Sequence, residues 1–288
     1  MADRLPKRSS VSQAQQAARA AFAAAGLDSP ALDARALICA VTGMDLTALA
    51  MNPDAMLTDE QQALLEDYIT QRLAHRPVSK IIGRREFWGR DFLVSDDVLD
   101  PRPDSETLIE AALALLPDDF AGTLIDLGTG SGCLLLTLLA ERPAAQGLGI
   151  DVSAAALAQA AANADRLGLA ARVTVQSGDW LRGVDRKVEM IVANPPYIST
   201  AEMAELAPDV AHYDPALALH GGPDGLDPYR LIVEAAPDCL MPDGWLVFEI
   251  GYRQAAAVSE LMQAAGFADI TCRQDLAGHD RVVLGQKK

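Results

Sequence analysis

The sequence has few cysteines and few histidines, four of each in 288 residues, and their positions match no common metal or disulfide site. The cysteines form no Cys-x-x-Cys pair, and the histidines lack metal-ligand spacing. We therefore expect no bound metal and a reducing, cytoplasmic location. No apolar run approaches the roughly 20 residues that span a bilayer, so we expect no membrane association.

Basic residues are scarce in the larger part of the chain. The sequence has 24 Lys and Arg against 40 Asp and Glu, a formal net charge of −16. Residues 1–90 carry 11 basic and 10 acidic side chains, and residues 91–288 carry 13 and 30. Nucleic-acid affinity rests largely on Lys and Arg that displace phosphate counterions. The charge therefore argues against direct binding of DNA or RNA.

Hydrophobic spacing divides the chain into three parts. A short basic tail with Arg4, Lys7 and Arg8 precedes an Ala-rich helical pattern, in which Thr58-Asp-Glu-Gln61 has the form of a capping box. Proline and glycine then punctuate short aromatic runs, which indicates a β-hairpin. We predict, in order, a helical domain, a hairpin linker and a third domain: residues 1–76, 77–100 and 101–288.

The third part alternates between strand and helix patterns, which favours a parallel sheet with helices on both faces. No internal repeat competes with this interpretation. The predicted strands are Leu124–Leu127, Gly147–Asp151, Val173–Val175, Met190–Asn194 and Trp245–Ile250.

A glycine-rich loop follows the first of these strands. Its sequence is Asp126-Leu-Gly-Thr-Gly-Ser-Gly132, so Gly128, Thr129, Gly130, Ser131 and Gly132 form a tight turn that lets a ligand approach the backbone. The dinucleotide fingerprint would place its third glycine where Cys133 stands, and no lysine follows to make a phosphate-binding P-loop. Asp126 instead suits an amino or sulfonium group, reached directly or through water.

Two later strand ends add to this site. Asp151 ends the next strand, where a carboxylate can accept hydrogen bonds from both hydroxyls of a ribose. Asp179 and Trp180 follow the third strand and offer a polar group and an aromatic surface for an adenine. Together with the glycine loop, these residues predict binding of S-adenosylmethionine, with S-adenosylhomocysteine as the product.

An Asn194-Pro-Pro-Tyr197 turn follows the fourth strand and should face the glycine loop. Pro195 and Pro196 remove two backbone donors and leave their carbonyl oxygens as acceptors. The side-chain oxygen of Asn194 and the carbonyl of Pro195 can hold an –NH2 group while Tyr197 packs against the planar group that bears it. Two acceptors localise the nitrogen lone pair and stabilise developing positive charge, so no His, Cys or Ser nucleophile is needed.

With these residues, the chain resembles the release factor glutamine methyltransferases (the PrmC/HemK family), within the class I S-adenosylmethionine-dependent fold. The resemblance extends from about Val11 onward. Besides the glycine loop and Asn194–Tyr197, it rests on these segments: Gly83–Gly89, Pro101–Glu106, Gly178–Trp180 and Arg281–Gly285. Two departures are slight, since Ser131 often stands as Thr and Asp100 stands where a hydrophobic residue is common.

The resemblance implies a small all-α N-terminal domain joined by a hairpin to a Rossmann-like, seven-stranded α/β methyltransferase domain. It also implies methylation of the glutamine side-chain nitrogen in the Gly-Gly-Gln motif of class 1 peptide release factors. By matching position, Gly128–Gly132, Asp151, Trp180 and Asn194 would contact the cofactor, and Asn194–Tyr197 the glutamine. We expect a monomer that binds release factors and no nucleic acid directly.

Three alternatives remain open at this point. A sister enzyme methylates a ribosomal-protein glutamine, and an adenine-amino methyltransferase of DNA or RNA also uses Asn-Pro-Pro-Tyr. A non-catalytic cofactor-binding scaffold is the third. Two features have more than one possible role. In Pro101–Glu106, Asp104 or Ser105 either only caps the next helix, or the segment also contacts substrate. Glu249 either lines the site or neutralises a neighbour.

Overall fold

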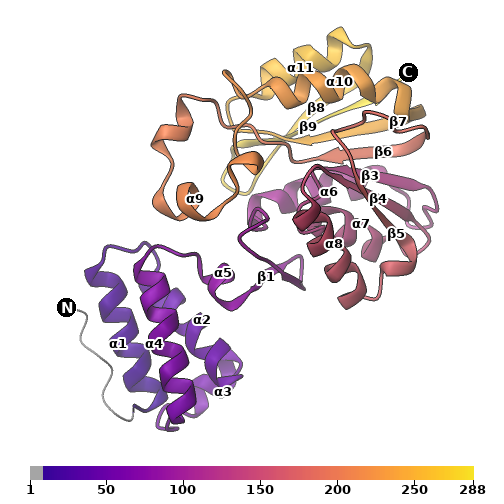
Figure 1. Cartoon of the computed structure of the whole chain (residues 1–288). Helices are drawn as coiled ribbons and strands as arrows, with labels where there is room; N and C mark the ends of the chain where they lie inside the picture. Colours follow the sequence, from indigo (N-terminus) through magenta and orange to yellow (C-terminus); the bar gives the residue numbers. More distant parts are fainter. Residues whose placement is uncertain (1–8) are drawn as a thin grey trace. The chain divides into compact units, whose positions relative to one another are not determined.

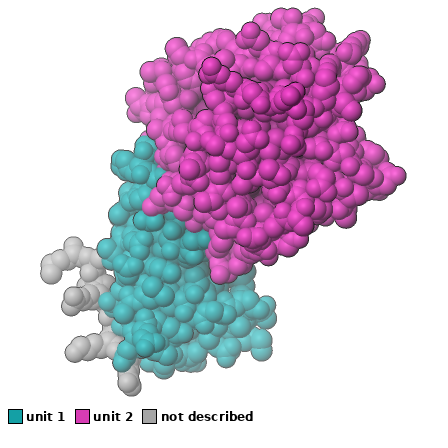
Figure 2. All heavy atoms as spheres, turned by 45° about the vertical axis from the view of Figure 1, so that its right-hand side comes forward, with its two compact units in different colours: residues 1–83, 208–213 teal, residues 84–207, 214–288 magenta. Residues whose placement is uncertain are grey.

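The computed structural model describes residues 9–288, so the predicted basic tail with Arg4, Lys7 and Arg8 lies outside the described residues. The chain forms two compact units, which Figure 2 shows in different colours. The first holds the residues up to Gly83 together with Pro208–Tyr213, and the second holds Arg84–Ala207 and Asp214–Lys288. Among the described residues, no helix has the length and apolar character needed to cross a membrane.

The first unit is a helical bundle. Its helices are α1 (Val11–Ala24), α2 (Pro30–Thr42), α3 (Leu46–Met51), α4 (Asp59–Leu73), α5 (Val78–Ile82) and α9 (Pro208–Tyr213). The predicted capping box is confirmed, because the Thr58 hydroxyl accepts from the amide of Gln61 and the Gln61 side chain accepts from the amide of Thr58. Apolar side chains such as Phe22, Leu37 and Leu65 are fully buried between the helices.

A buried arginine fastens α9 within this unit. Arg72 of α4 pairs with Asp33 of α2 at 2.7 Å and with Asp209 of α9 at 3.0 Å. The Tyr213 hydroxyl donates to the carbonyl of Ala74 at 2.7 Å. A segment more than 120 residues along the chain from α4 is therefore part of the bundle, which sequence periodicity did not indicate.

The second unit begins with a β-hairpin and continues as a doubly wound sheet (Figure 1). Strand β1 (Arg84–Phe87) pairs antiparallel with β2 (Arg90–Leu93). The strands of the large sheet are β3 (Thr123–Leu127), β4 (Gln146–Asp151), β5 (Val173–Ser177), β6 (Val188–Ala193), β7 (Leu240–Glu249), β8 (Phe267–Gln274) and β9 (Asp280–Lys287). Their order is β5-β4-β3-β6-β7-β9-β8, with β9 antiparallel to both of its neighbours.

Helices cover both faces of this sheet, as the apolar strands require. One face carries α6 (Glu106–Leu115), α7 (Cys133–Glu141) and α8 (Ala154–Arg166), and the other carries α10 (Asp227–Cys239) and α11 (Ala255–Ala264) (Figure 1). The predicted seven-stranded α/β architecture with a helical N-terminal domain is confirmed. The strand order reverses between β3 and β6, and ligands bind at the carboxyl ends of the strands at such a switch point.

We predict that Arg72→Met destabilises the helical unit by about 2–4 kcal/mol, because it leaves the carboxylate of Asp33, whose side chain is only 13% exposed, without its partner. The urea dependence of unfolding, followed by circular dichroism of the whole chain, measures this. Arg19→Met on the exposed face of α1 is the matched control and should change the free energy of unfolding by less than about 0.5 kcal/mol. Equal effects of the two variants would contradict a structural role for Arg72.

Candidate active site

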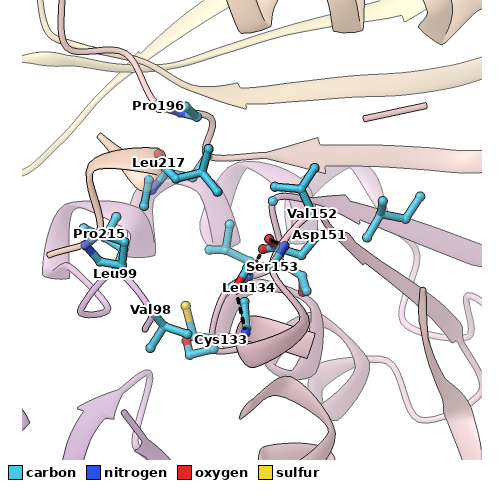
Figure 3. A pocket seen from close by; sticks show the side chains of 18 of the residues that line it. Val98, Leu99, Cys133, Leu134, Asp151, Val152, Ser153, Pro196, Pro215 and Leu217 are labelled. Atoms are coloured by element: carbon cyan, nitrogen blue, oxygen red, sulfur yellow. Dashed lines mark hydrogen bonds between the residues drawn. The ribbon is translucent and has the colours of Figure 1, made fainter. Parts of the chain in front are cut away.

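Loops at the carboxyl ends of β3, β4, β5 and β6 surround a cavity of about 300 Å³. Figure 3 shows its apolar side chains Leu99, Pro215 and Leu217 across from Asp151 and Val152. The other residues used below that line it come from several loops: Asp97, Asp100, Pro101, Arg102, Ser105, Gly128–Ser131, Ser153, Asp179, Trp180, Asn194, Pro196 and His220. The structure thus brings most of the predicted site residues to one place.

The glycine loop adopts the tight turn that its sequence predicts. Gly128 and Gly130 have φ of 68° and 53°, a region that disfavours other residues. The amides of Gly128 and Thr129 both donate to the carbonyl of Ile150 in β4, at 2.8 and 3.0 Å. A Cβ at Gly128 would make an ordinary contact of 3.6 Å with the ring of Trp180, so the positive φ, not the ring, is what favours glycine here.

Asp126 lies beneath the loop and is not among the residues that line the cavity. It is 1% exposed, and the hydroxyl of Thr129 donates to its Oδ2 at 2.7 Å. Burial raises the pKa of Asp126 to about 7, and the charge of Asp151 adds to this effect while the hydrogen bond from Thr129 opposes it. Direct contact with a cofactor stays a prediction, and the contact that the structure shows is with the loop.

Asp151 ends β4 as expected, and the backbone holds its carboxylate in place. Oδ2 accepts from the amide of Gly130 at 3.0 Å. Oδ1 accepts from the amide of Ser153 at 2.9 Å, and Figure 3 shows these two residues side by side. A carboxylate has about four acceptor positions, so two remain after these bonds. Asp151 can therefore accept from neighbouring hydroxyl groups without moving.

Trp180 lies at the cavity as expected, and its contact with an adenine stays a prediction. Its φ of 51° is unusual for a large residue, and its ring lines the cavity beside Gly128. The ring also packs against the apolar cluster on the α10 face of the sheet. Asp179 lines the cavity as well. A planar ligand group therefore has an aromatic surface and a carboxylate at the end of β5.

The Asn194–Tyr197 turn leaves β6 toward the same cavity. Asn194 and Pro196 line it, whereas Pro195 and Tyr197 do not. The carbonyl of Tyr197 accepts from the side chain of Gln254 at 3.0 Å, which anchors the end of the turn. Burial, with the charge of Glu249, raises the pKa of Tyr197 to about 12, so its ring is neutral.

The segment Pro101–Glu106 contributes more than the start of a helix. Ser105 stands at the N-cap of α6 but makes no capping hydrogen bond, so that expectation is wrong. Its hydroxyl oxygen instead accepts from Nδ2 of Asn194 at 3.5 Å. Arg102 lines the cavity and pairs with Asp214 at 2.6 Å. This segment therefore contacts Asn194, which lies 89 residues after Ser105 in the chain.

Sequence reasoning missed one wall of the cavity. Pro215, Leu217 and His220 come from an irregular segment between β6 and α10. This segment has no hydrophobic period that would place its side chains. Its prolines signal a loop but do not tell which cavity the loop covers.

Comparison with known proteins shows which family the chain belongs to. Two family models match the chain, the PrmC N-terminal domain over residues 13–83 and the methyltransferase small domain over residues 96–212. The release factor glutamine methyltransferase of Cereibacter sphaeroides is 49% identical over 274 residues, 94% of this chain and 97% of that protein. That of Rhodospirillum rubrum is 45% identical, over 92% of this chain and 81% of that protein.

The chain belongs to the release factor glutamine methyltransferase family. A solved methyltransferase from Pyrococcus furiosus is 14% identical with a TM-score of 0.53, covers 77% of this chain and 98% of that one, and shows the shared fold. The methyltransferase is S-adenosylmethionine-dependent, as the glycine loop and the acid after it predict.

The lining residues of this methyltransferase fit that cofactor. Four carboxylates, those of Asp97, Asp100, Asp151 and Asp179, line the cavity, against one guanidinium, that of Arg102. An excess of negative charge suits a ligand that carries a sulfonium and an amino group. The aromatic ring of Trp180 and the held carboxylate of Asp151 match a nucleoside.

We predict that the affinity of the methyltransferase for S-adenosylmethionine rises with pH between 6 and 8. A cationic ligand prefers the ionised form of Asp126, whose pKa in the free protein is about 7. The Kd should therefore be about tenfold larger at pH 6 than at pH 8. Asp126→Asn should bind more weakly at pH 8 and lose this pH dependence.

Isothermal titration calorimetry at several pH values measures this effect, with neutral adenosine as the control ligand. The Kd of adenosine should vary little with pH in both proteins. A wild-type Kd for S-adenosylmethionine that stays constant from pH 6 to 8 would contradict the role given to Asp126.

Proposed function

We propose that Asn194–Tyr197 holds the glutamine of a Gly-Gly-Gln motif in class 1 peptide release factors, and that its N5 nitrogen receives the methyl group. One observation carries this proposal: Asn194 opens into the cavity that the glycine loop also lines. Membership in the release factor glutamine methyltransferase family supports the same substrate. Nothing in this site requires an ionised nucleophile.

An amide nitrogen is a weak nucleophile, and the Asn194–Tyr197 turn can compensate for this weakness. Its lone pair is delocalised into the carbonyl group, so the protein must orient it and stabilise the positive charge that develops. Oδ1 of Asn194 and the carbonyl oxygen of Pro195 accept the two N–H bonds, while Tyr197 packs against the amide plane. Holding reactants in a near-attack geometry contributes roughly 7–11 kcal/mol in favourable cases.

Bound S-adenosylmethionine supplies an electrophilic methyl carbon, which forms the new N–C bond as its C–S bond breaks, and the substrate nitrogen then releases a proton. The residues of this chain bind and orient the reactants. Rigid loops at the carboxyl ends of the strands suit this task, because β6 and the proline rings fix the backbone of the turn.

The alternatives differ from this proposal in substrate. A ribosomal-protein glutamine would use the same turn, and an adenine amino group would present a similar planar –NH2. The 30 acidic against 13 basic residues in 91–288 disfavour a nucleic acid. We also infer a cytoplasmic monomer.

We predict that the protein transfers label from S-adenosylmethionine with a radioactive methyl group to an unmodified class 1 release factor. Mass spectrometry should place the methyl group on the Gly-Gly-Gln glutamine. A release factor with that glutamine replaced by asparagine is the matched control, since the shorter side chain does not reach the turn. Label on ribosomal protein or duplex DNA, and none on the release factor, would refute the proposal.

We further predict that Asn194→Ala lowers kcat by about 100-fold or more, because it removes one acceptor for the substrate amide. The Kd for S-adenosylmethionine should rise by a much smaller factor than kcat falls, since the glycine loop, Asp151 and Trp180 remain. Asn52→Ala, at an exposed helix end in the first unit, is the control and should retain the wild-type kcat. Near-normal turnover by Asn194→Ala would exclude the amide-holding role.

A further inference from the structure

Glu249 is a buried carboxyl group at the end of β7 that the chemistry described so far does not use. The residue is 2% exposed. In the parallel ladder of β6 and β7, Ala193 lies opposite Phe248. Asn194 and Glu249 are the next residues along the two chains, so they also lie opposite each other. Side chains at the same level of neighbouring parallel strands point to the same face. The carboxyl group of Glu249 and the amide group of Asn194 are therefore neighbours.

The immediate contacts of Glu249 lead to Asn194. Burial raises the pKa of Glu249 to about 7, and hydrogen bonds from the side chains of Ser105 and Asn194 oppose this rise. Ser105 also accepts from Nδ2 of Asn194 at 3.5 Å. Oε2 of Glu249 is buried and has no hydrogen-bond partner within residues 9–288. Two acceptors, one of them a carboxyl group, thus gather around the amide of Asn194.

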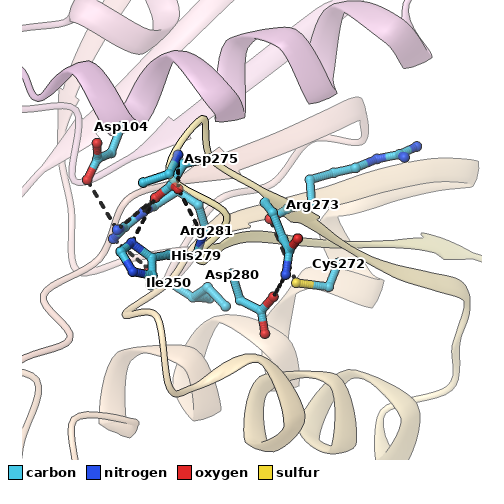
Figure 4. A network of polar contacts seen from close by, with 10 residues as sticks. Asp104, Ile250, Cys272, Arg273, Asp275, His279, Asp280 and Arg281 are labelled. Carbon is cyan, nitrogen blue, oxygen red and sulfur yellow. Dashed lines mark hydrogen bonds and ion pairs between the residues drawn. The ribbon is translucent and has the colours of Figure 1, made fainter.

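Arg281 is the nearby positive charge, and other carboxylates already neutralise it. Figure 4 shows its guanidinium between Asp104, at 3.1 Å, and Asp275, at 3.2 Å. It also donates to the carbonyl of Ile250 at 3.4 Å. Its charge lowers the pKa of Glu249, but no ion pair between the two is present in the described part of the chain. Neutralising Arg281 is therefore not sufficient reason for a carboxyl group at 249.

The remaining groups around Glu249 are uncharged near neutral pH, apart from Asp104, whose charge raises the pKa of Glu249. Tyr229 of α10 donates its hydroxyl to the backbone carbonyl of Glu249 at 2.9 Å. Burial raises the pKa of both Tyr197 and Cys133 to about 12, and Glu249 contributes to both shifts. Glu249 is thus the group in this set whose charge changes near pH 7.

We propose that Glu249 is a positioning residue, whose carboxylate acts with Ser105 to hold Nδ2 of Asn194 and so presents Oδ1 to the substrate amide. A carboxylate has no proton to donate, so it can bind the amide of Asn194 only through Nδ2. A protonated carboxyl group, or a glutamine, can also donate to Oδ1 and hold the amide group turned over. The –NH2 group of Asn194 would then face the –NH2 group of the substrate. This inference rests on the proposed role of Asn194.

The orientation of Asn194 should therefore depend on pH. Above pH 7 Glu249 is ionised and the acceptor Oδ1 faces the cavity, whereas below pH 7 both orientations of the amide become available. At saturating S-adenosylmethionine, kcat should rise as the pH increases through about 7. We expect bound cofactor to keep Asp126 ionised there, so the rise of kcat is assigned to Glu249 by its loss in a Glu249 variant.

Steady-state kinetics of Glu249→Gln tests the proposal. We expect kcat to fall on the order of 10- to 100-fold, as for other losses of orientation at a reacting centre. The rise of kcat through pH 7 should disappear, and the Kd for S-adenosylmethionine should stay within about twofold of wild type. Ser105→Ala, which keeps the carboxylate, should lower kcat less and retain the rise.

Glu189→Gln is the matched control, because Glu189 lies on β6 away from the site and accepts from the amide of Thr123 at 2.7 Å. It should retain the wild-type kcat and pH profile. A wild-type kcat and profile in Glu249→Gln would overturn the proposal. Equal losses of cofactor binding and kcat in that variant would also overturn it, because they indicate a purely structural role.

Nuclear magnetic resonance of the Asn194 side-chain amide provides a readout that needs no activity. This resonance, assigned by its loss in Asn194→Ala, should titrate with a midpoint near pH 7 in wild type and not in Glu249→Gln. Titration without methyl transfer to a release factor would support the positioning role and refute the proposed function. Transfer without titration would support the function and overturn the positioning role.

Discussion

The reversal of strand order between β3 and β6 is the constraint on which the rest of the site depends. Parallel strands all end at one edge, and the reversal leaves room between two of them. The glycine loop leaves from one side of that gap and the Asn-Pro-Pro-Tyr turn from the other. The glycine loop and the Asn-Pro-Pro-Tyr turn are 62 residues apart, counted from Gly132 to Asn194, and the reversal brings both to one cavity.

Two carboxyl groups near the site, those of Asp126 and Glu249, are buried. The pKa values of both Asp126 and Glu249 are raised to about 7, chiefly by burial. A carboxyl group whose pKa is raised on folding holds its proton more tightly in the folded protein, so the free energy of unfolding falls as the pH increases toward 7. This loss of stability arises at two positions next to the cavity, Asp126 and Glu249. Such a loss is typical of groups that are kept for binding or catalysis.

Much of the site could be predicted because its signals are local. Glycine spacing, an acid at a strand end and two consecutive prolines each determine backbone shape or donor and acceptor chemistry within a few residues. Tertiary contacts decided what remained. Ser105 stands at a helix N-cap, yet its oxygen accepts a hydrogen bond from Asn194 and none from the helix. A hydroxyl group binds whichever partner the fold brings near. Asp126 lies beneath the glycine loop, where it accepts from the hydroxyl of Thr129, and Thr129 rather than Asp126 lines the cavity. The direct ligand contacts of these residues stay predictions.

A crystal structure with S-adenosylhomocysteine and a Gly-Gly-Gln peptide tests the central claim most directly. The quantity to measure is the distance from the glutamine side-chain nitrogen to Oδ1 of Asn194 and to the carbonyl oxygen of Pro195. We expect both distances to lie in the hydrogen-bond range of about 2.7–3.2 Å, with the nitrogen directed at the cofactor sulfur. A glutamine amide bound outside the reach of Asn194, or facing its –NH2 group, would contradict the account.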